Sequence, residues 1–132
     1  MADDAHGEAV TSLPIGGNLS ELRERTRDFL TPAKLGERQE ANFILAISEA
    51  ANNVLDHART PGVLVLRRYA DRVVAEISDE AGTLTDPRAG MTAPEVGSRR
   101  GYGLWLMRQM CDEVEITSGP AGSTVRLVMR CD

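Results

Sequence analysis

Aromatic residues, cysteines and long apolar runs are all scarce in this 132-residue sequence. Aromatics make up only 4% of it, so we expect an aliphatic core. The cysteines, Cys111 and Cys131, lack the spacing of metal ligands, which is typical of a protein from a reducing compartment. No apolar run approaches the ~18 residues of a membrane span, and the first residues lack the charged and apolar segments of a secretory signal. We therefore expect a cytoplasmic protein without membrane contacts.

An excess of positive charge is also missing. The formal net charge is −5, which argues against a broad nucleic-acid-binding surface. The hydrophobic content of 42% and the charged content of 27% are those of a globular protein, and the length is sufficient for one domain with its own core. We expect residues 1–8 to be a disordered lead and residues 9–132 to form the domain.

The most informative stretch is Phe43–Ala58, which has the apolar period of a helix. Glu49, Asn53 and His57 form a polar stripe beside its apolar face, because they are spaced at i, i+4 and i+8. An amide oxygen together with substrate phosphates and water is a suitable shell for Mg²⁺, and a carboxylate one turn away can orient or deprotonate a hydroxyl. The same pattern is also typical of an ordinary amphipathic helix with a solvated polar face.

Other segments alternate or repeat as strands and helices do. We expect a helix over Asn18–Leu30, where Asn18 and Glu21 form a capping box, and another that starts at Leu104. Gly36 precedes the long helix, which ends before a Thr60-Pro61-Gly62 turn. Strands are expected at Ala9–Ile15, Val63–Tyr69, Val73–Asp79, Glu113–Ser118 and Ser123–Cys131, the last four as two hairpins.

Polar side chains end two of the apolar strand rows. Asp79 follows the row of Val73, Ala75 and Ile77. A carboxylate there needs a hydrogen-bond donor, for which the exocyclic amino group of a purine is suitable, although a strand-end Asp also commonly caps a turn. Ser123 shares a face with Val125, Leu127 and Met129, whereas Thr124 points the other way. Both hydroxyl residues are also ordinary residues next to a turn.

The segment from Glu80 to Arg100 has no regular period, and unstructured segments of this length are often lids or binding loops. It leads into Gly101 and Gly103, just before the helix start at Leu104. Glycines followed by a helix N-terminus can form a phosphate cradle, and Arg99 and its neighbour could add charge-assisted contacts.

Four pieces of the sequence resemble the gyrase, chaperone, histidine kinase and mismatch-repair (GHKL) ATP-binding fold in order and spacing. They are Glu49-Ala-Ala-Asn52-Asn53, Asp79-Glu-Ala-Gly82, Gly101-Tyr-Gly103-Leu104 and Gly122-Ser123-Thr124-Val125. The compact size is similar to that of the small bacterial anti-sigma factor serine/threonine kinases. The expected architecture is an α+β two-layer sandwich, with a mixed, mostly antiparallel sheet and helices on one face.

This resemblance implies a role for each matching residue. Glu49 would be the general base, Asn53 would ligate Mg²⁺ and Asp79 would accept the adenine amino hydrogen. His57 would be a packing residue or a ligand. The other residues expected at the nucleotide are Gly82, Arg99, Gly101, Gly103, Leu104, Ser123 and Thr124. ATP and Mg²⁺ are the cofactors implied.

One piece departs from the family pattern. The usual form is Asp-x-Gly-x-Gly, but Ala81 and Thr83 replace both glycines and Gly82 is shifted by one position. A methyl group at position 81 would crowd the adenine, and the backbone there loses the freedom for positive φ. We therefore expect the departure to affect nucleotide affinity by crowding the adenine. The implied base, Glu49, and the implied metal ligand, Asn53, are both present.

The resemblance implies a kinase that phosphorylates an antagonist protein and binds a sigma factor. The resemblance to these small kinases also implies a homodimer, for which the first strand and the helix over Asn18–Leu30 are the most available elements. Two other interpretations stay open: a non-catalytic binding module whose lid responds to nucleotide, and the catalytic domain of a histidine kinase acting in trans. A purely structural protein would leave the ordered motifs unexplained.

Overall fold

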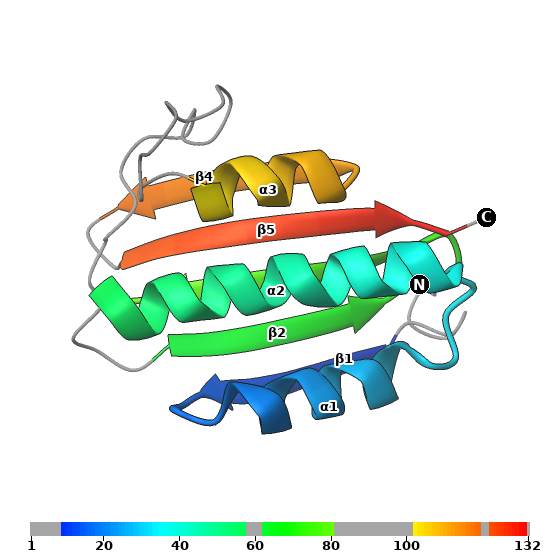
Figure 1. The fold of residues 1–132 in the computed structure, drawn as a ribbon, viewed down its shortest axis with the longest axis horizontal. Coiled ribbons are helices and arrows are strands. Elements are labelled where there is room, and N and C mark those ends of the chain that lie inside the picture. Colours follow the sequence, from blue (N-terminus) through cyan, green and yellow to red (C-terminus); the bar gives the residue numbers. More distant parts are fainter. Residues whose placement is uncertain (1–8, 58–61, 81–101, 120–121, 132) are drawn as a thin grey trace.

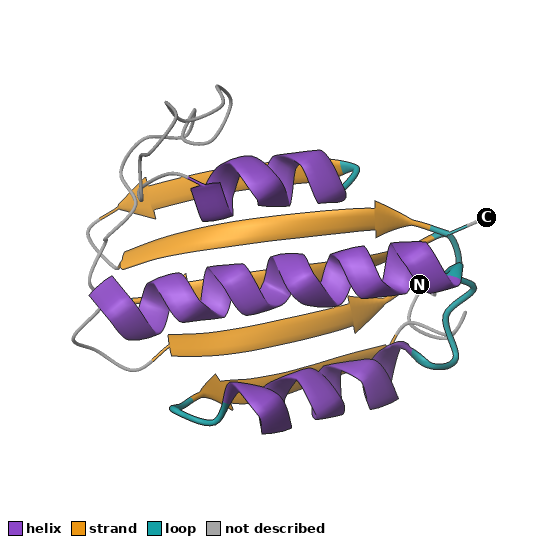
Figure 2. Cartoon of the chain, viewed as in Figure 1, coloured by secondary structure: helices purple, strands orange, loops and turns teal. Residues whose placement is uncertain are grey.

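A computed structural model describes residues 9–57, 62–80, 102–119 and 122–131. Its strands are β1 (Ala9–Ile15), β2 (Gly62–Arg68), β3 (Arg72–Asp79), β4 (Glu113–Gly119) and β5 (Gly122–Arg130). Its helices are α1 (Leu19–Leu30), α2 (Glu37–His57) and α3 (Tyr102–Met110). The helices lie together on one face of the sheet (Figure 1, Figure 2). The expected α+β two-layer sandwich is therefore confirmed.

The strands form one five-stranded sheet in the order β1-β2-β3-β5-β4. Each neighbouring pair is antiparallel, so the expected mixed sheet has no parallel pair among the described strands. The chain path explains the direction of the β1–β2 pair. The antiparallel helices α1 and α2 return the chain to the end where β1 finished, so β2 runs back alongside it and Ile15 pairs with Gly62 (Figure 1).

The core lies between α2 and the sheet. The apolar side of α2 is buried as its period predicts, with Phe43 fully buried and Val54 only 6% exposed. The inward row of β3 and that of β5 are buried as well, down to Asp79 and Ser123 at their ends. This burial confirms the alternation predicted for both strands. The core is aliphatic apart from Phe43.

Side-chain caps define where two of the helices begin. The amide of Glu21 donates to Asn18 Oδ1 at 3.0 Å, which confirms Asn18 as the cap of α1. Before α2, the amide of Gly36 donates to Gln39 Oε1 at 3.0 Å. Gln39 Nε2 also donates to the carbonyl of Arg130 at 3.1 Å, which ties the start of α2 to the end of β5. The other end of this helix, which carries Glu49, is held as well, because Val54 in its last turns packs on β2.

Some predictions lie outside the described residues. These are the disordered lead over residues 1–8, Thr60 and Pro61 of the turn, the lid over residues 81–100 and the hairpin tip at residues 120–121. The strand predicted to start at Val63 starts one residue earlier, at Gly62.

Candidate functional site

Helix α2 brings an acid and an amide to the border of the core. Glu49 and Asn53 are each half-buried, whereas the neighbouring Asn52 is exposed. Because they are four residues apart, Glu49 and Asn53 lie on one side of the helix, one turn from each other. The buried Ala50 and Val54 next to them hold this side of the helix against the core. A carboxylate and an amide in this arrangement can orient a hydroxyl and hold a hydrated cation.

A second pair of polar groups lies at the adjoining ends of β3 and β5. Asp79 pairs with Ser123 in the sheet register, and the two residues are only 6% and 3% exposed. Ser123 Oγ donates to Asp79 Oδ2 at 3.0 Å, which satisfies one oxygen of a buried carboxylate. A carboxylate in this position can also accept a hydrogen bond from an amino group of a ligand.

Gly122 makes the close approach of these two strand ends possible. Its φ of +125° belongs to a region that residues with a side chain rarely adopt. A methyl group on Gly122 would lie 1.9 Å from the carbonyl oxygen of Asp79. The glycine therefore lets the start of β5 lie directly against the end of β3, where Ser123 reaches Asp79.

Gly62 joins the helix part of the site to the strand part. It is the first residue of β2 and pairs with Asp79. A methyl group on Gly62 would lie 2.6 Å from Cγ1 of Val54, so the backbone of β2 touches the side chain that follows Asn53. The C-terminal end of α2, the start of β2 and the start of β5 accordingly lie at the same end of the molecule (Figure 1).

A hollow of about 410 Å³ lies at these strand ends, a volume within the usual range for small-molecule pockets. It is lined by Gly62, Val63, Ser78, Asp79, Glu80, Gly122, Ser123 and Thr124. No residue of α2 is among the described residues that line it. Thr124 belongs to the face opposite Ser123, as predicted, and its Oγ1 lies 2.9 Å from Ser78 Oγ. The hydroxyl of Thr124 is thus engaged with a neighbouring strand.

Helix α3 begins at Tyr102, two residues earlier than predicted. Gly103 and Leu104 therefore lie within its first turn, where backbone amides have no partner inside the helix. The first turn contains no acidic residue, so no side chain of this turn would repel an anion bound at the helix N-terminus. Gly82, Arg99 and Gly101 lie outside the described residues, as do Ala81 and Thr83. His57 ends α2, but its side chain is also outside the described part.

The donor set of the described residues suits a magnesium nucleotide better than a metal held by the protein alone. No group of three or more His, Cys, Asp or Glu side chains that could hold a metal occurs in the described ranges. Mg²⁺ usually keeps several waters and takes one or two protein oxygens together with substrate phosphates. The half-buried Asn53 amide fits this requirement, and the buried Asp79 carboxylate fits a ligand with an amino group.

Comparison with known proteins decides the family. The sequence model of the histidine kinase-like ATPase domain matches residues 15–129. The chain belongs to the histidine kinase-like ATPase domain family. It is therefore an ATP-binding, kinase-like ATPase domain, and the residues matched include Glu49, Asn53, Asp79 and Ser123. No match was found among the curated proteins.

Several solved structures share the fold, and two of them are compared with this chain. One contains the RsbU and RsbW domains of Rv1364c from Mycobacterium tuberculosis, with a TM-score of 0.67, 20% identity and 93% of this chain covered. The other is the histidine kinase domain of the blue-light activated histidine kinase EL346 from Erythrobacter litoralis, with a TM-score of 0.55, 17% identity and 96% of this chain covered. This chain spans 32% of the length of the first chain and 66% of the second.

In the described ranges, no helix has the length and the apolar character needed to cross a bilayer.

Sequence reasoning missed the importance of Gly62. The sequence treats this residue as the end of the Thr60-Pro61-Gly62 turn, whereas it opens β2 and contacts α2 in the structure. Its only local signal is a glycine in front of a strand, which ordinary turns share.

Proposed function

We propose that the protein is an ATP- and Mg²⁺-dependent serine/threonine protein kinase. In this proposal Asn53 would hold the Mg²⁺ of the nucleotide, Glu49 would activate the acceptor hydroxyl and Asp79 would accept a hydrogen bond from the adenine amino group. The observation that carries the proposal is the arrangement around Gly62, where the helix with the acid and amide meets the strand end with the buried carboxylate. Phosphoryl transfer needs mainly positioning and charge neutralisation from the protein. In this proposal the arrangement provides the positioning, and the Mg²⁺ held by Asn53 would neutralise the phosphate charge.

We propose further that the phosphate goes to an antagonist protein in a partner-switching system and that the kinase binds a sigma factor. The motif resemblance supports this assignment, and so does the fold shared with a protein that contains RsbU and RsbW domains. The net charge of −5 favours protein partners over nucleic acid. A kinase with these partners would act in the cytoplasm.

The test is transfer of labelled γ-phosphate to a candidate antagonist, with nucleotide binding measured in parallel. Glu49→Gln is expected to reduce transfer by at least about a hundredfold, in line with the loss of a general base, while ATP binding stays within a few-fold of wild type. The matched control is Glu37→Gln, since Glu37 is exposed at the other end of the same helix. An equal transfer rate in Glu49→Gln and Glu37→Gln would exclude Glu49 as the base.

The metal role of Asn53 is tested against its neighbour. Asn53→Ala is expected to weaken ATP binding in Mg²⁺ and to leave binding in EDTA nearly unchanged. Asn52→Ala removes the same side chain from the exposed position beside it and should alter neither value. If both variants lose the Mg²⁺ effect equally, the metal ligand lies elsewhere.

The outcomes also separate the other interpretations. Wild-type protein that binds Mg²⁺-ATP but transfers no phosphate would be a nucleotide-dependent binding module. An acid-labile phosphorylated product would indicate phosphohistidine and therefore a histidine kinase acting in trans. An acid-stable product on serine or threonine is the result that we expect.

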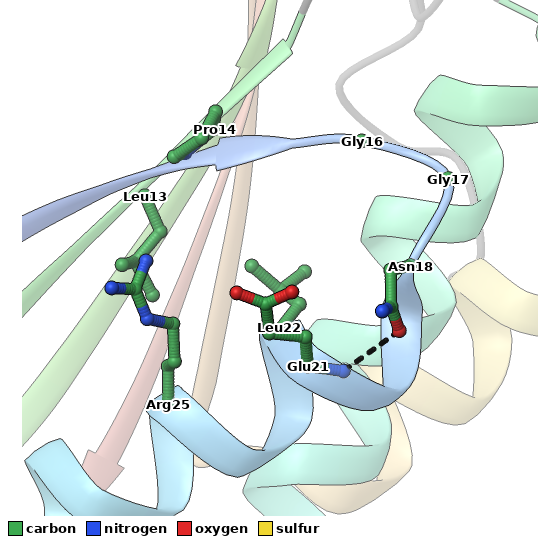
Figure 3. A pocket seen from close by; sticks show the side chains of 8 residues that line it. All are labelled: Leu13, Pro14, Gly16, Gly17, Asn18, Glu21, Leu22 and Arg25. Atoms are coloured by element: carbon green, nitrogen blue, oxygen red, sulfur yellow. Dashed lines mark hydrogen bonds between the residues drawn. The ribbon is translucent and has the colours of Figure 1, made fainter.

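A homodimer through β1 is part of the proposal. β1 is an edge strand, and an edge strand offers unpaired backbone groups to another chain. Val10 is 52% exposed there. A hollow of about 230 Å³ lies between β1 and α1, with Leu13 on one side and Glu21 and Arg25 on the other (Figure 3).

The dimer is tested by sedimentation of substituted proteins. Val10→Lys is expected to shift wild-type dimer to monomer, because it places a charge at the proposed interface. Thr117→Lys puts the same charge on β4, at the opposite edge of the sheet, and should leave the dimer intact. A wild-type monomer, or dimers in both variants, would contradict the β1 interface.

A further inference from the structure

Gly62 is enclosed by three different elements at a point where no side chain fits. It is buried, and a methyl group there would lie 2.6 Å from Val54 Cγ1 of α2, 3.1 Å from the carbonyl oxygen of Ser78 in β3 and 3.3 Å from Ile15 Cδ1 in β1. Carbon atoms in contact normally lie about 3.5–4.0 Å apart. The contact with Val54 is therefore closer than a methyl group can tolerate by about 1 Å.

We expect the helix to move, because the clashing atom belongs to the β-branched side chain of Val54, which has one strongly preferred rotamer in a helix. Gly62 itself is held in the ladder between Ile15 on one side and Asp79 on the other, so displacing it would disturb hydrogen bonds to both neighbours. Val54 lies near the end of α2, three residues before the helix finishes at His57. A shift of Val54 would carry Asn53 with it, because the two are adjacent in the same helical turn.

We propose that Gly62 is a positioning residue of the nucleotide site and that its missing side chain sets the separation between the Asn53 amide and the Asp79 carboxylate. This inference rests on the proposed function, in which these two groups hold opposite ends of one nucleotide. Asp79 holds the base and Asn53 holds the phosphates through Mg²⁺. A displacement of about 1 Å between groups that act together on a substrate can lower the reaction rate about a hundredfold.

The measurable quantity is the gain in ATP affinity that Mg²⁺ provides, taken as the ratio of the Kd in EDTA to the Kd in Mg²⁺. Adenosine binding reports the base end alone. In Gly62→Ala we expect the Mg²⁺ gain to fall about tenfold or more, while the Kd for adenosine stays within about threefold. A residue that only stabilised the fold would change both values together or neither. Gly16→Ala is the matched control, since a methyl group there has no neighbour within 4 Å.

The contact itself can be tested by rescue. Val54→Ala removes the atom that a methyl group on Gly62 would strike, so the double variant Gly62→Ala/Val54→Ala should recover the Mg²⁺ gain to within about threefold of wild type. If Gly62→Ala does not fold, Val54→Ile approaches the same contact from the helix side and leaves Gly62 unchanged. It should lower the Mg²⁺ gain while adenosine binding persists.

Several results would overturn the inference: an unchanged Mg²⁺ gain in Gly62→Ala, an equal loss of adenosine binding, or no recovery in the double variant. The last result would assign the effect to the Ser78 carbonyl instead of the helix. All measurements use binding alone. A wild-type protein with the Mg²⁺ gain but no phosphate transfer would therefore contradict only the kinase proposal, whereas a wild type without the gain would contradict both.

Discussion

Substituting Gly122 by alanine is expected to destabilise the protein through the strand ends that carry Asp79 and Ser123. Two costs add up. The φ of +125° is unfavourable for a residue with a side chain by about 1–3 kcal/mol. In addition, the new methyl group would lie 1.9 Å from the carbonyl oxygen of Asp79, so the strand ends must separate and the bond from Ser123 to Asp79 is lost. A hydrogen bond to a charged group contributes about 1.5–3 kcal/mol.

The free energy of unfolding should therefore fall by roughly 2.5–6 kcal/mol. At about 3 °C per kcal/mol for a domain of this size, the Tm should fall by roughly 8–18 °C. Thermal unfolding followed by circular dichroism measures this shift, and adenosine binding measures the accompanying loss of the proposed adenine contact at Asp79. Both are expected to change in the same variant, because one contact is responsible for both.

The matched control is Gly17→Ala. A methyl group on Gly17 meets nothing within 4 Å, and its φ lies outside the left-handed region, so the Tm should change little or rise slightly. If Gly122→Ala lowers the Tm no more than Gly17→Ala, the steric argument for the start of β5 is wrong. A large Tm loss with unchanged adenosine binding would instead show that the strand ends are not part of the base site.

Three further predictions concern single contacts. Ser123→Ala should weaken adenosine binding while Ser123→Thr keeps it, because only the hydroxyl donates to Asp79. Arg68→Met should lower the free energy of unfolding in urea by about 2 kcal/mol, since the guanidinium donates to the Phe29 carbonyl and lies 4.7 Å over its ring. Burial, and secondly the charge of the adjacent aspartate, raises the pKa of Cys111 from 9.0 to about 12. Because the folded pKa is the higher one, this stabilisation is complete below pH 9 and is lost as pH rises toward 12, by about 1.4 kcal/mol per unit. Between pH 8 and pH 10, urea titrations should therefore show that wild type loses about 1.4 kcal/mol more free energy of unfolding than Cys111→Ala does.

Local patterns were sufficient for most of the secondary structure. The stripe that includes Phe43 and Val54 has the period of a helix, and the rows that end at Asp79 and Ser123 alternate as strands do. Such periods depend only on residues close in sequence, so they can be read without knowing the fold. The cap at Asn18 is local for the same reason, because its acceptor serves an amide three residues away.

Pairing between distant segments is different. Ser123 and Asp79 are separated by 44 positions, and alternation alone places each at the end of a row without saying that the rows are neighbours. The order β1-β2-β3-β5-β4 is what brings them together. Every described pair of strands is antiparallel. The direction of a strand depends on the elements that connect it to its neighbour, and the apolar alternation within a strand carries no information about direction.

The amino-acid sequence by itself determined the elements and the inward faces, since these depend on residue types at short, regular spacing, and it determined the family through the order of separated motifs along the chain. Only the tertiary structure decided that Gly62 lies between the helix of Asn53 and the strand of Asp79. The physical reason is that a missing side chain leaves no pattern of its own: it matters only where another element occupies the space that the side chain would need.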